Sequence, residues 1–182
     1  KWLISFHNYV RGLLKNQMKD LDMAKTNDTE GKLQKEALFE FDRMLHINTL
    51  LMMYSYLEEW LYHCWRVYLP HVDLENRRGS ISRFKNIAKQ LGVNLSSRLW
   101  QDVKNAEEVR NCLLHANGRI SLCKDSQKIK QIIKSKNSGL KIMKDRVVVS
   151  GDYLQRFNNT ISALLDIIHQ KGTQQPVHGS PD

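Results

Sequence analysis

The chain has 182 residues, of which 41% are hydrophobic and 26% charged, and its formal net charge is +9. This length predicts one domain with a core that needs neither disulfides nor metals. With only 9 Gly and 3 Pro, the composition excludes collagen and low-complexity disorder. The basic excess indicates an anionic partner, nucleic acid first and a membrane surface second.

Cysteine content and hydropathy suggest a cellular compartment. Cys64, Cys112 and Cys123 are too few and too scattered for a disulfide framework, and no CxxC motif occurs. We therefore expect a reducing, cytoplasmic location. No apolar run reaches the roughly 18–20 residues of a membrane span, and no signal peptide is visible, so we expect no membrane association. Because the chain begins with Lys1 and not Met, we expect residues to precede it.

The first half of the chain is predicted to be helical. Residues 2–24 carry large apolar residues at helical spacing, and the polar segment 26–31 ends that helix. A long helix then runs from about Leu33 to Leu69 and stops at Pro70. Its apolar residues recur at spacings of three and four, the seam of a helical bundle: Leu50, Met53, Leu57, Leu61, Cys64 and Tyr68.

The second half predicts shorter elements. After a loop at 71–80, we expect a short helix that ends near Gly92 and a longer helix from Ser96–Ser97 to about Ala116, which Asn117-Gly118 stops. A Lys-rich helix at 125–136 follows. The chain then forms a β-hairpin at 139–149, which turns at Lys144-Asp145, and a last helix at 152–170. The fold class is therefore all-α, a helical bundle with a small β-hairpin. We expect one domain over 1–171 and a flexible tail over 172–182.

Arg110 is the first residue that could carry chemistry. On a helical wheel it lies in an apolar row with Leu99, Val103, Ala106 and Leu113. An arginine in such a row must be paired or line a cleft. Two explanations remain open: Arg110 pairs with Glu107 or extends outward, or it serves a site.

A second face of the same helix carries polar residues. Glu108, Asn111 and His115 fall close together on the wheel, and Asn111 and His115 are i, i+4 neighbours. A lone helical histidine is usually structural. Arg110 and Asn111 lie within five residues of His115, and a basic region follows. This grouping favours a functional role for His115.

The segment RNCLLH at 110–115 resembles the Arg-x4–6-His signature of the HEPN superfamily, with a polar residue after the arginine. A weaker similarity lies in YLEEWLYHCW at 56–65, where Glu58 precedes an aromatic-Leu pair, as in many HEPN proteins. The resemblance covers roughly 33–170. It implies a HEPN-like helical bundle that dimerises, and active members are metal-independent endoribonucleases, often toxins or antiphage effectors.

The resemblance implies roles for particular residues. The catalytic set would be Arg110, Asn111, His115 and Glu58. His115 would act as general acid or base, and Arg110 would stabilise the phosphate. No metal or other cofactor is expected. Because Arg110 and His115 lie about 140° apart on an ideal helix, we expect a homodimer with the 96–117 helices near its twofold axis, and an antitoxin or regulatory protein as a further partner.

Residues 119–146 form a basic segment with nine basic and two acidic residues. It follows the motif directly, so we expect it to guide RNA, with Arg119, Lys124, Lys128, Lys130 and Lys134 as the contacts; a solvated face is the competing interpretation. Two other functions compete with the endoribonuclease. One is a non-catalytic HEPN-like scaffold that binds RNA or protein. The other is an unrelated bundle that binds DNA, which no helix-turn-helix pattern supports.

Overall fold

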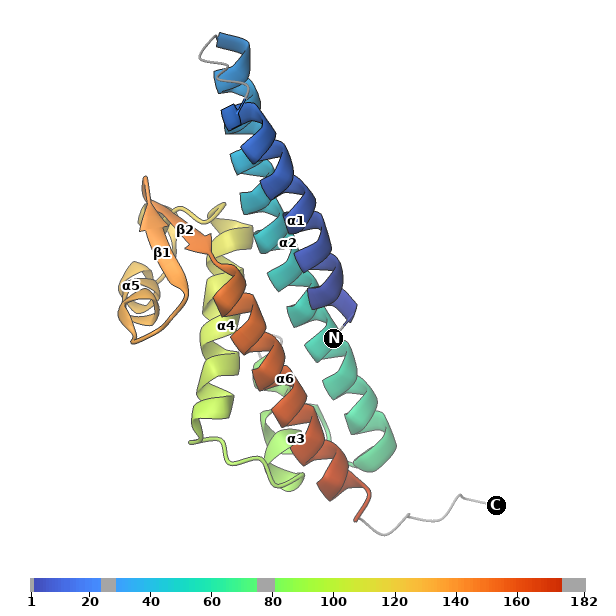
Figure 1. Ribbon diagram of the computed structural model, residues 1–182. Coiled ribbons are helices and arrows are strands. Elements are labelled where there is room, and N and C mark those ends of the chain that lie inside the picture. Colours follow the sequence, from blue (N-terminus) through green and yellow to red (C-terminus); the bar gives the residue numbers. More distant parts are fainter. Residues whose placement is uncertain (1, 24–28, 75–80, 175–182) are drawn as a thin grey trace. The chain divides into compact units, whose positions relative to one another are not determined.

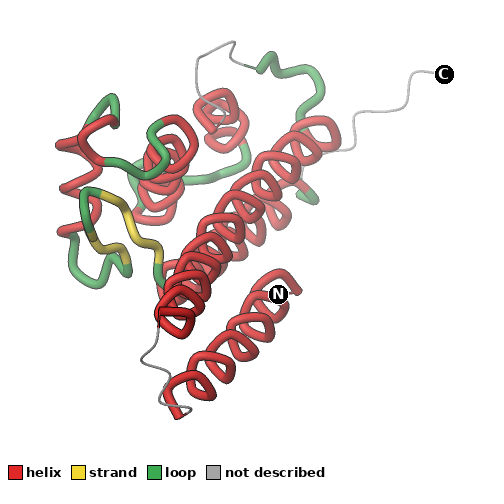
Figure 2. Tube along the Cα trace, turned by 90° about the horizontal axis from the view of Figure 1, so that it is seen from above, coloured by secondary structure: helices red, strands yellow, loops and turns green. Residues whose placement is uncertain are grey.

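The computed structural model describes residues 2–23, 29–74 and 81–174. Within these ranges the protein is mostly helical, and the one β-hairpin is visible in Figure 2. The α-helices are α1 (Trp2–Met23), α2 (Thr29–Tyr68), α3 (Lys85–Gln90), α4 (Arg98–His115), α5 (Ser126–Lys134) and α6 (Gly151–Gly172), labelled in Figure 1. Two 3-10 turns, η1 (Ile81–Phe84) and η2 (Ile120–Leu122), precede α3 and α5, and the strands are β1 (Leu140–Met143) and β2 (Arg146–Val149).

These elements confirm the predicted fold class, all-α with a small hairpin. Several boundaries differ by a few residues from those expected from the sequence. Residues 29–31, predicted as part of a polar break, already belong to α2, and α6 extends to Gly172. Most of the predicted tail, residues 175–182, lies outside the described residues.

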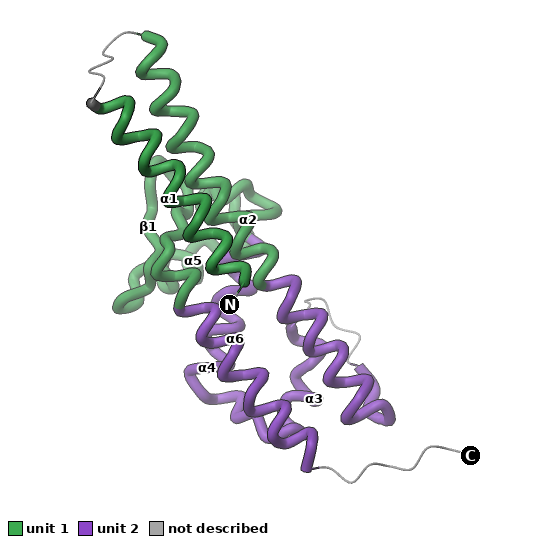
Figure 3. The backbone as a smooth tube through the Cα atoms, turned by 45° about the vertical axis from the view of Figure 1, so that its right-hand side comes forward, with its two compact units in different colours: residues 1–53, 112–155 green, residues 54–111, 156–182 purple. Residues whose placement is uncertain are grey.

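The chain divides into two compact units that alternate along the sequence (Figure 3). Unit 1 contains Lys1–Met53 and Cys112–Gln155, and unit 2 contains Tyr54–Asn111 and Arg156–Asp182. The divisions fall within helices α2, α4 and α6. The single domain expected over 1–171 stays a prediction.

In unit 1, α1 runs antiparallel to the first part of α2. Three polar contacts along the pair fix this direction: His7 Nδ1 to Thr49 Oγ1 at 3.0 Å, Arg11 Nε to Asp42 Oδ1 at 3.2 Å and Lys35 Nζ to Asp22 Oδ1 at 2.7 Å. The hairpin belongs to the same unit, and its strands pair from Leu140–Val149 to Met143–Arg146. Lys144 and Asp145 have φ of 46° and 65°, the left-handed pair that a two-residue turn requires.

The core of unit 2 is built around the second part of α2. Leu57, Leu61 and Cys64, members of the predicted seam, are at most 5% exposed. The rings of Tyr54 and Phe157 stack at 6.5 Å and join α2 to α6, and the hydroxyl of Tyr68 lies 2.8 Å from His169 Nδ1 between the same helices. The seam prediction is therefore confirmed from Leu50 to Cys64, whereas Tyr68 is only half-buried.

Candidate functional site

Helix α4 carries the RNCLLH motif, and local signals set both of its ends. Ser97 Oγ accepts a hydrogen bond from the backbone N–H of Trp100 at 3.4 Å, as an N-cap does. At the other end Asn117 and Gly118 have φ of 49° and 71°, and the Gly118 N–H donates to the carbonyl of Cys112 at 3.0 Å. This left-handed C-terminal cap is the stop that the Asn-Gly pair predicted.

Arg110 is half-buried in unit 2 and has two partners there. Its guanidinium carbon lies 5.5 Å from the ring centroid of Tyr54, which is itself fully buried. Its Nη1 donates to Asn111 Oδ1 at 3.0 Å. A guanidinium over an aromatic face gains electrostatic attraction and has little freedom to reorient. The structure therefore brings Arg110 and Asn111 together, and Tyr54 is a contact that sequence reasoning missed.

Glu107, the predicted structural partner of Arg110, forms its ion pair with Lys104. Glu107 is 4% exposed, and its Oε2 pairs with Lys104 Nζ one turn earlier on α4. The same ammonium donates to Ser82 Oγ at 2.8 Å, which ties α4 to η1. The alternative in which Arg110 pairs with Glu107 is therefore wrong for this structure. The second oxygen of Glu107, Oε1, is buried without a hydrogen-bond partner among the described residues.

Glu58 is half-buried on α2, one turn after Tyr54. Within the described residues no ion pair joins it to Arg110, although both belong to unit 2. Glu58 therefore lies one helical turn from Tyr54, the residue that contacts Arg110. Its assignment to the catalytic set stays a prediction.

His115 is the last residue of α4, and its side chain is exposed. It belongs to unit 1, whereas Arg110 and Asn111 belong to unit 2, because the division falls between Asn111 and Cys112. An exposed imidazole at a helix end is accessible to a ligand from solvent. The surroundings of Arg110 and Asn111 are therefore described within unit 2, and those of His115 within unit 1.

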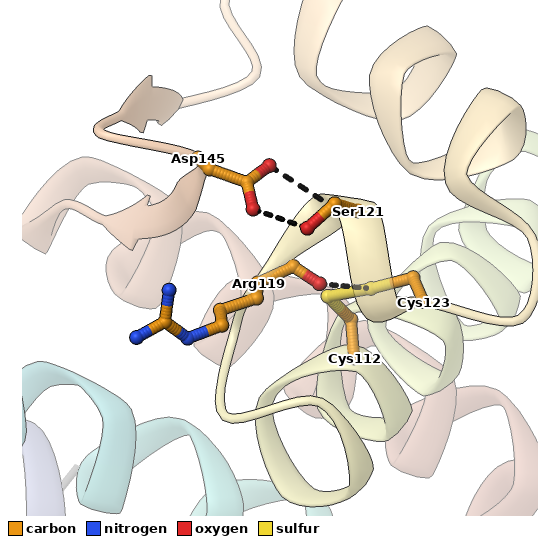
Figure 4. Close-up of a disulfide and its surroundings, with 5 residues drawn as sticks. All are labelled: Cys112, Arg119, Ser121, Cys123 and Asp145. Atoms are coloured by element: carbon orange, nitrogen blue, oxygen red, sulfur yellow. Dashed lines mark hydrogen bonds between the residues drawn. A yellow bond between two sulfur atoms is a disulfide. The ribbon is translucent and has the colours of Figure 1, made fainter.

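Cys112, inside the motif, forms a disulfide with Cys123, and their Cα atoms are 5.4 Å apart (Figure 4). One bridge is not the disulfide framework that the cysteine count argued against, but the sequence did not predict this pair, and the pair weakens the argument for a reducing compartment. The turn at Asn117-Gly118 reverses the chain, which brings two residues 11 positions apart into contact. The remaining cysteine, Cys64, is buried and free, and its burial raises the pKa of its thiol.

The segment after the disulfide is tied to the hairpin turn. Asp145 accepts hydrogen bonds from the hydroxyl and the backbone N–H of Ser121 (Figure 4), and its own carbonyl accepts from the Ile120 N–H at 2.8 Å. The Ser121 hydroxyl is the main cause that lowers the pKa of Asp145. Arg119 pairs with Arg146 in an isolated β-bridge, and its side chain is exposed.

The predicted RNA-contacting lysines lie on or beside α5 in unit 1. Asp125 caps this helix by accepting from the Lys128 N–H at 2.9 Å, and Ile129 and Ile132 are its buried residues. Lys124, Lys130 and Lys134 are exposed, and Lys130 and Lys134 are i, i+4 neighbours on the solvent side. Both acidic residues of the basic segment therefore hold local structure, since Asp125 caps α5 and Asp145 binds Ser121.

A buried histidine pair in unit 1 was not foreseen. His7 and His46 are 1% and 3% exposed, and their ring centroids are 4.7 Å apart. Thr49 donates its hydroxyl proton to the Leu45 carbonyl, so His7 Nδ1–H must donate to Thr49 Oγ1, and His46 Nδ1 lies 2.7 Å from the Asp42 carbonyl. Burial, with His46 and Arg11 adding to it, lowers the pKa of His7 to about 4. The His7 imidazole therefore fits the neutral form.

Among the described residues no group of three or more His, Cys, Asp or Glu side chains could hold a metal ion, and no helix is long and apolar enough to cross a membrane. No family model matches the chain, and neither a curated protein nor a solved structure is significantly similar to it. The assignment of function therefore depends on the motif and on the chemistry of its residues.

Proposed function

We propose that this protein is a metal-independent endoribonuclease of HEPN type, acting as a toxin or an antiphage effector. The observation that carries the proposal is the RNCLLH segment on α4, with His115 exposed at the helix end and Arg110 held over Tyr54. A cytoplasmic location, a homodimer and an antitoxin or regulatory protein as partner belong to the same proposal.

The proposed reaction uses the nucleophile that RNA itself supplies. A base removes the proton from a 2′-OH, the 2′ oxygen attacks the adjacent phosphorus, and the bond to the 5′ oxygen breaks as that oxygen takes up a proton. The products are a 2′,3′-cyclic phosphate and a 5′-OH. An imidazole such as His115 can move a proton near neutral pH. A guanidinium such as Arg110 can donate two hydrogen bonds to the charge that builds on phosphate oxygens.

Two contacts in the structure restrict the motion of the Arg110 side chain. The Tyr54 ring and Asn111 Oδ1 fix the guanidinium in one orientation, which lowers the entropy lost when it binds an anion. Nη1 is engaged with Asn111, and a guanidinium retains further N–H groups for a phosphate. Asn111 is thus proposed as a positioning residue for Arg110.

Cleavage of total RNA in the presence of EDTA tests the proposal. His115→Ala should lose at least about a hundredfold in rate, the scale expected for a missing general acid or base. His63→Ala is the matched control, because His63 is also an exposed helical histidine, and it should keep full activity. Equal cleavage by the His115→Ala protein would refute the assignment, and 5′-phosphate ends would indicate a metal-dependent reaction instead.

A non-catalytic scaffold that binds RNA or protein is the second candidate. The packing of Arg110 against Tyr54 and Asn111 favours it, because these contacts alone give the arginine a structural role. This candidate predicts RNA binding without cleavage. It also predicts that His115→Ala leaves binding unchanged while Arg110→Ala reduces the stability of the fold.

Salt dependence separates RNA contacts on α5 from a solvated face. Each lysine that neutralises a phosphate on a single strand contributes about −0.7 to the log–log salt slope. Lys130→Gln with Lys134→Gln should therefore make the slope shallower by about 1.4. The matched control replaces Lys15 and Lys19, two exposed lysines of α1, with Gln. Binding should be measured in the His115→Ala background, and an unchanged slope would mean that RNA binds elsewhere.

A further inference from the structure

Helix α1 has a buried face and, opposite to it, an exposed apolar face. Ile4, His7 and Leu14 are buried and face the core of unit 1. The other face carries an outer row of four large apolar side chains that remain exposed. Their exposed fractions are 74% for Trp2, 51% for Phe6, 66% for Tyr9 and 49% for Leu13. The rings of Trp2 and Phe6 stack on each other at 5.9 Å, so the row presents a continuous surface.

The spacing of the outer row is symmetric. Its steps along the helix are four, three and four residues, which reads the same in both directions. Two copies of α1 can therefore meet antiparallel across a twofold axis that passes between Phe6 and Tyr9. In that arrangement Trp2 of one copy faces Leu13 of the other, and Phe6 faces Tyr9. The largest side chain thus meets the smallest, which suits close packing between helices.

The charges of α1 are compatible with this contact. No charged residue lies within the row, so two chains of net charge +9 would meet on a neutral surface. Lys15 lies beyond Leu13, and in the antiparallel pair the two Lys15 residues are about 22 Å apart along the helix axis, at about 1.5 Å per residue. That distance exceeds the screening length of about 8 Å at physiological salt, so their repulsion is small.

The exposed area limits the size of the contact. A fully exposed large side chain has about 200 Å² of surface, so the outer row offers roughly 500 Å² per copy and about 1,000 Å² for a pair. Specific interfaces of this total size are at the weak, transient end. A contact of this size fits a reversible dimer rather than a permanent one.

We infer that the outer row of α1 is the surface through which a second copy of this chain binds, with the two α1 helices antiparallel. Within the described residues of α4, Leu114 is the one large hydrophobic side chain that is exposed, so that helix offers no comparable apolar surface. The inferred contact on α1 is separate from the expected contact between the 96–117 helices, which stays a prediction. It does not depend on ribonuclease activity.

Sedimentation velocity of the whole chain over micromolar to tens of micromolar concentrations tests the inference. The unaltered protein should shift from monomer to dimer, and Tyr9→Lys or Phe6→Lys should raise the dissociation constant at least about tenfold, a loss of 1.4 kcal/mol. Met52→Lys is the matched control: Met52 is 54% exposed on the neighbouring helix and should leave the dimer intact. Circular dichroism should show equal helicity in all four proteins.

Three results would overturn the inference. The first is a protein that remains monomeric at tens of micromolar. The second is a dimer that Met52→Lys disrupts and Tyr9→Lys does not. The third is a monomer that binds vesicles containing phosphatidylserine and loses that binding in Tyr9→Lys, since the row would then dock on a membrane surface. A dimer that only the two α1 variants weaken supports it.

Discussion

His7 should make the protein lose stability as the pH falls. Its pKa is lowered from 6.5 to about 4 in the folded protein, chiefly by burial, with His46 and Arg11 adding to the shift and Asp42 opposing it. Between these two values the unfolded chain binds more protons than the folded one, so stability is full above about pH 6.5 and declines toward pH 4. At 1.36 kcal/mol per pKa unit, the loss relative to pH 7.5 is about 2 kcal/mol at pH 5 and about 3 kcal/mol at pH 4.

His7→Gln isolates this contribution. Glutamine can still donate a hydrogen bond to Thr49 Oγ1, but it does not titrate. Urea denaturation at pH 7.5 and at pH 5 should show that the variant loses about 2 kcal/mol less than the unaltered protein does. His115→Gln replaces an exposed histidine with the same residue, glutamine, and serves as the matched control variant. Parallel pH dependences for the His7→Gln and unaltered proteins would refute the reasoning.

Three further predictions concern stability. Lys104→Met should cost about 3 kcal/mol in urea denaturation, because it leaves the buried Glu107 carboxylate without its partner, and adding Glu107→Leu should recover much of the loss. Cys112→Ser with Cys123→Ser should lower stability by about 3 kcal/mol in the absence of reductant and have no further effect in its presence. Gly118→Ala should cost about 1–2 kcal/mol by thermal denaturation, because φ at this position is 71°.

Local signals predicted the helices and the hairpin. The seam from Leu50 to Cys64 follows helical spacing and is buried, because side chains that recur every three or four residues share one face of a helix. Asn117-Gly118 and Lys144-Asp145 mark chain reversals, and all four residues adopt positive φ. In each case the information lies within a few residues of the element that it determines.

Contacts between distant segments were not predictable in this way. The contact between the Arg110 guanidinium and the Tyr54 ring joins α4 to α2. The residue spacing within either helix does not specify this contact. The disulfide of Cys112 depends on the path of the chain through the turn at Gly118. Periodicity also placed Trp2 and Phe6 on a helix without showing that they face solvent, because an apolar row has the same spacing whether or not another element covers it.

The acidic residues of the basic segment show how local structure shapes its electrostatics. Asp125 and Asp145 could in principle neutralise part of the charge of residues 119–146. Asp125 directs its carboxylate to the first turn of α5, and Asp145 directs its carboxylate to Ser121. These hydrogen bonds fix the positions of the two negative charges, and the charges of Arg119 and Lys130 also help to lower the pKa of Asp145. Lys130 and Lys134 are both exposed, so an anionic polymer has access to them from solvent.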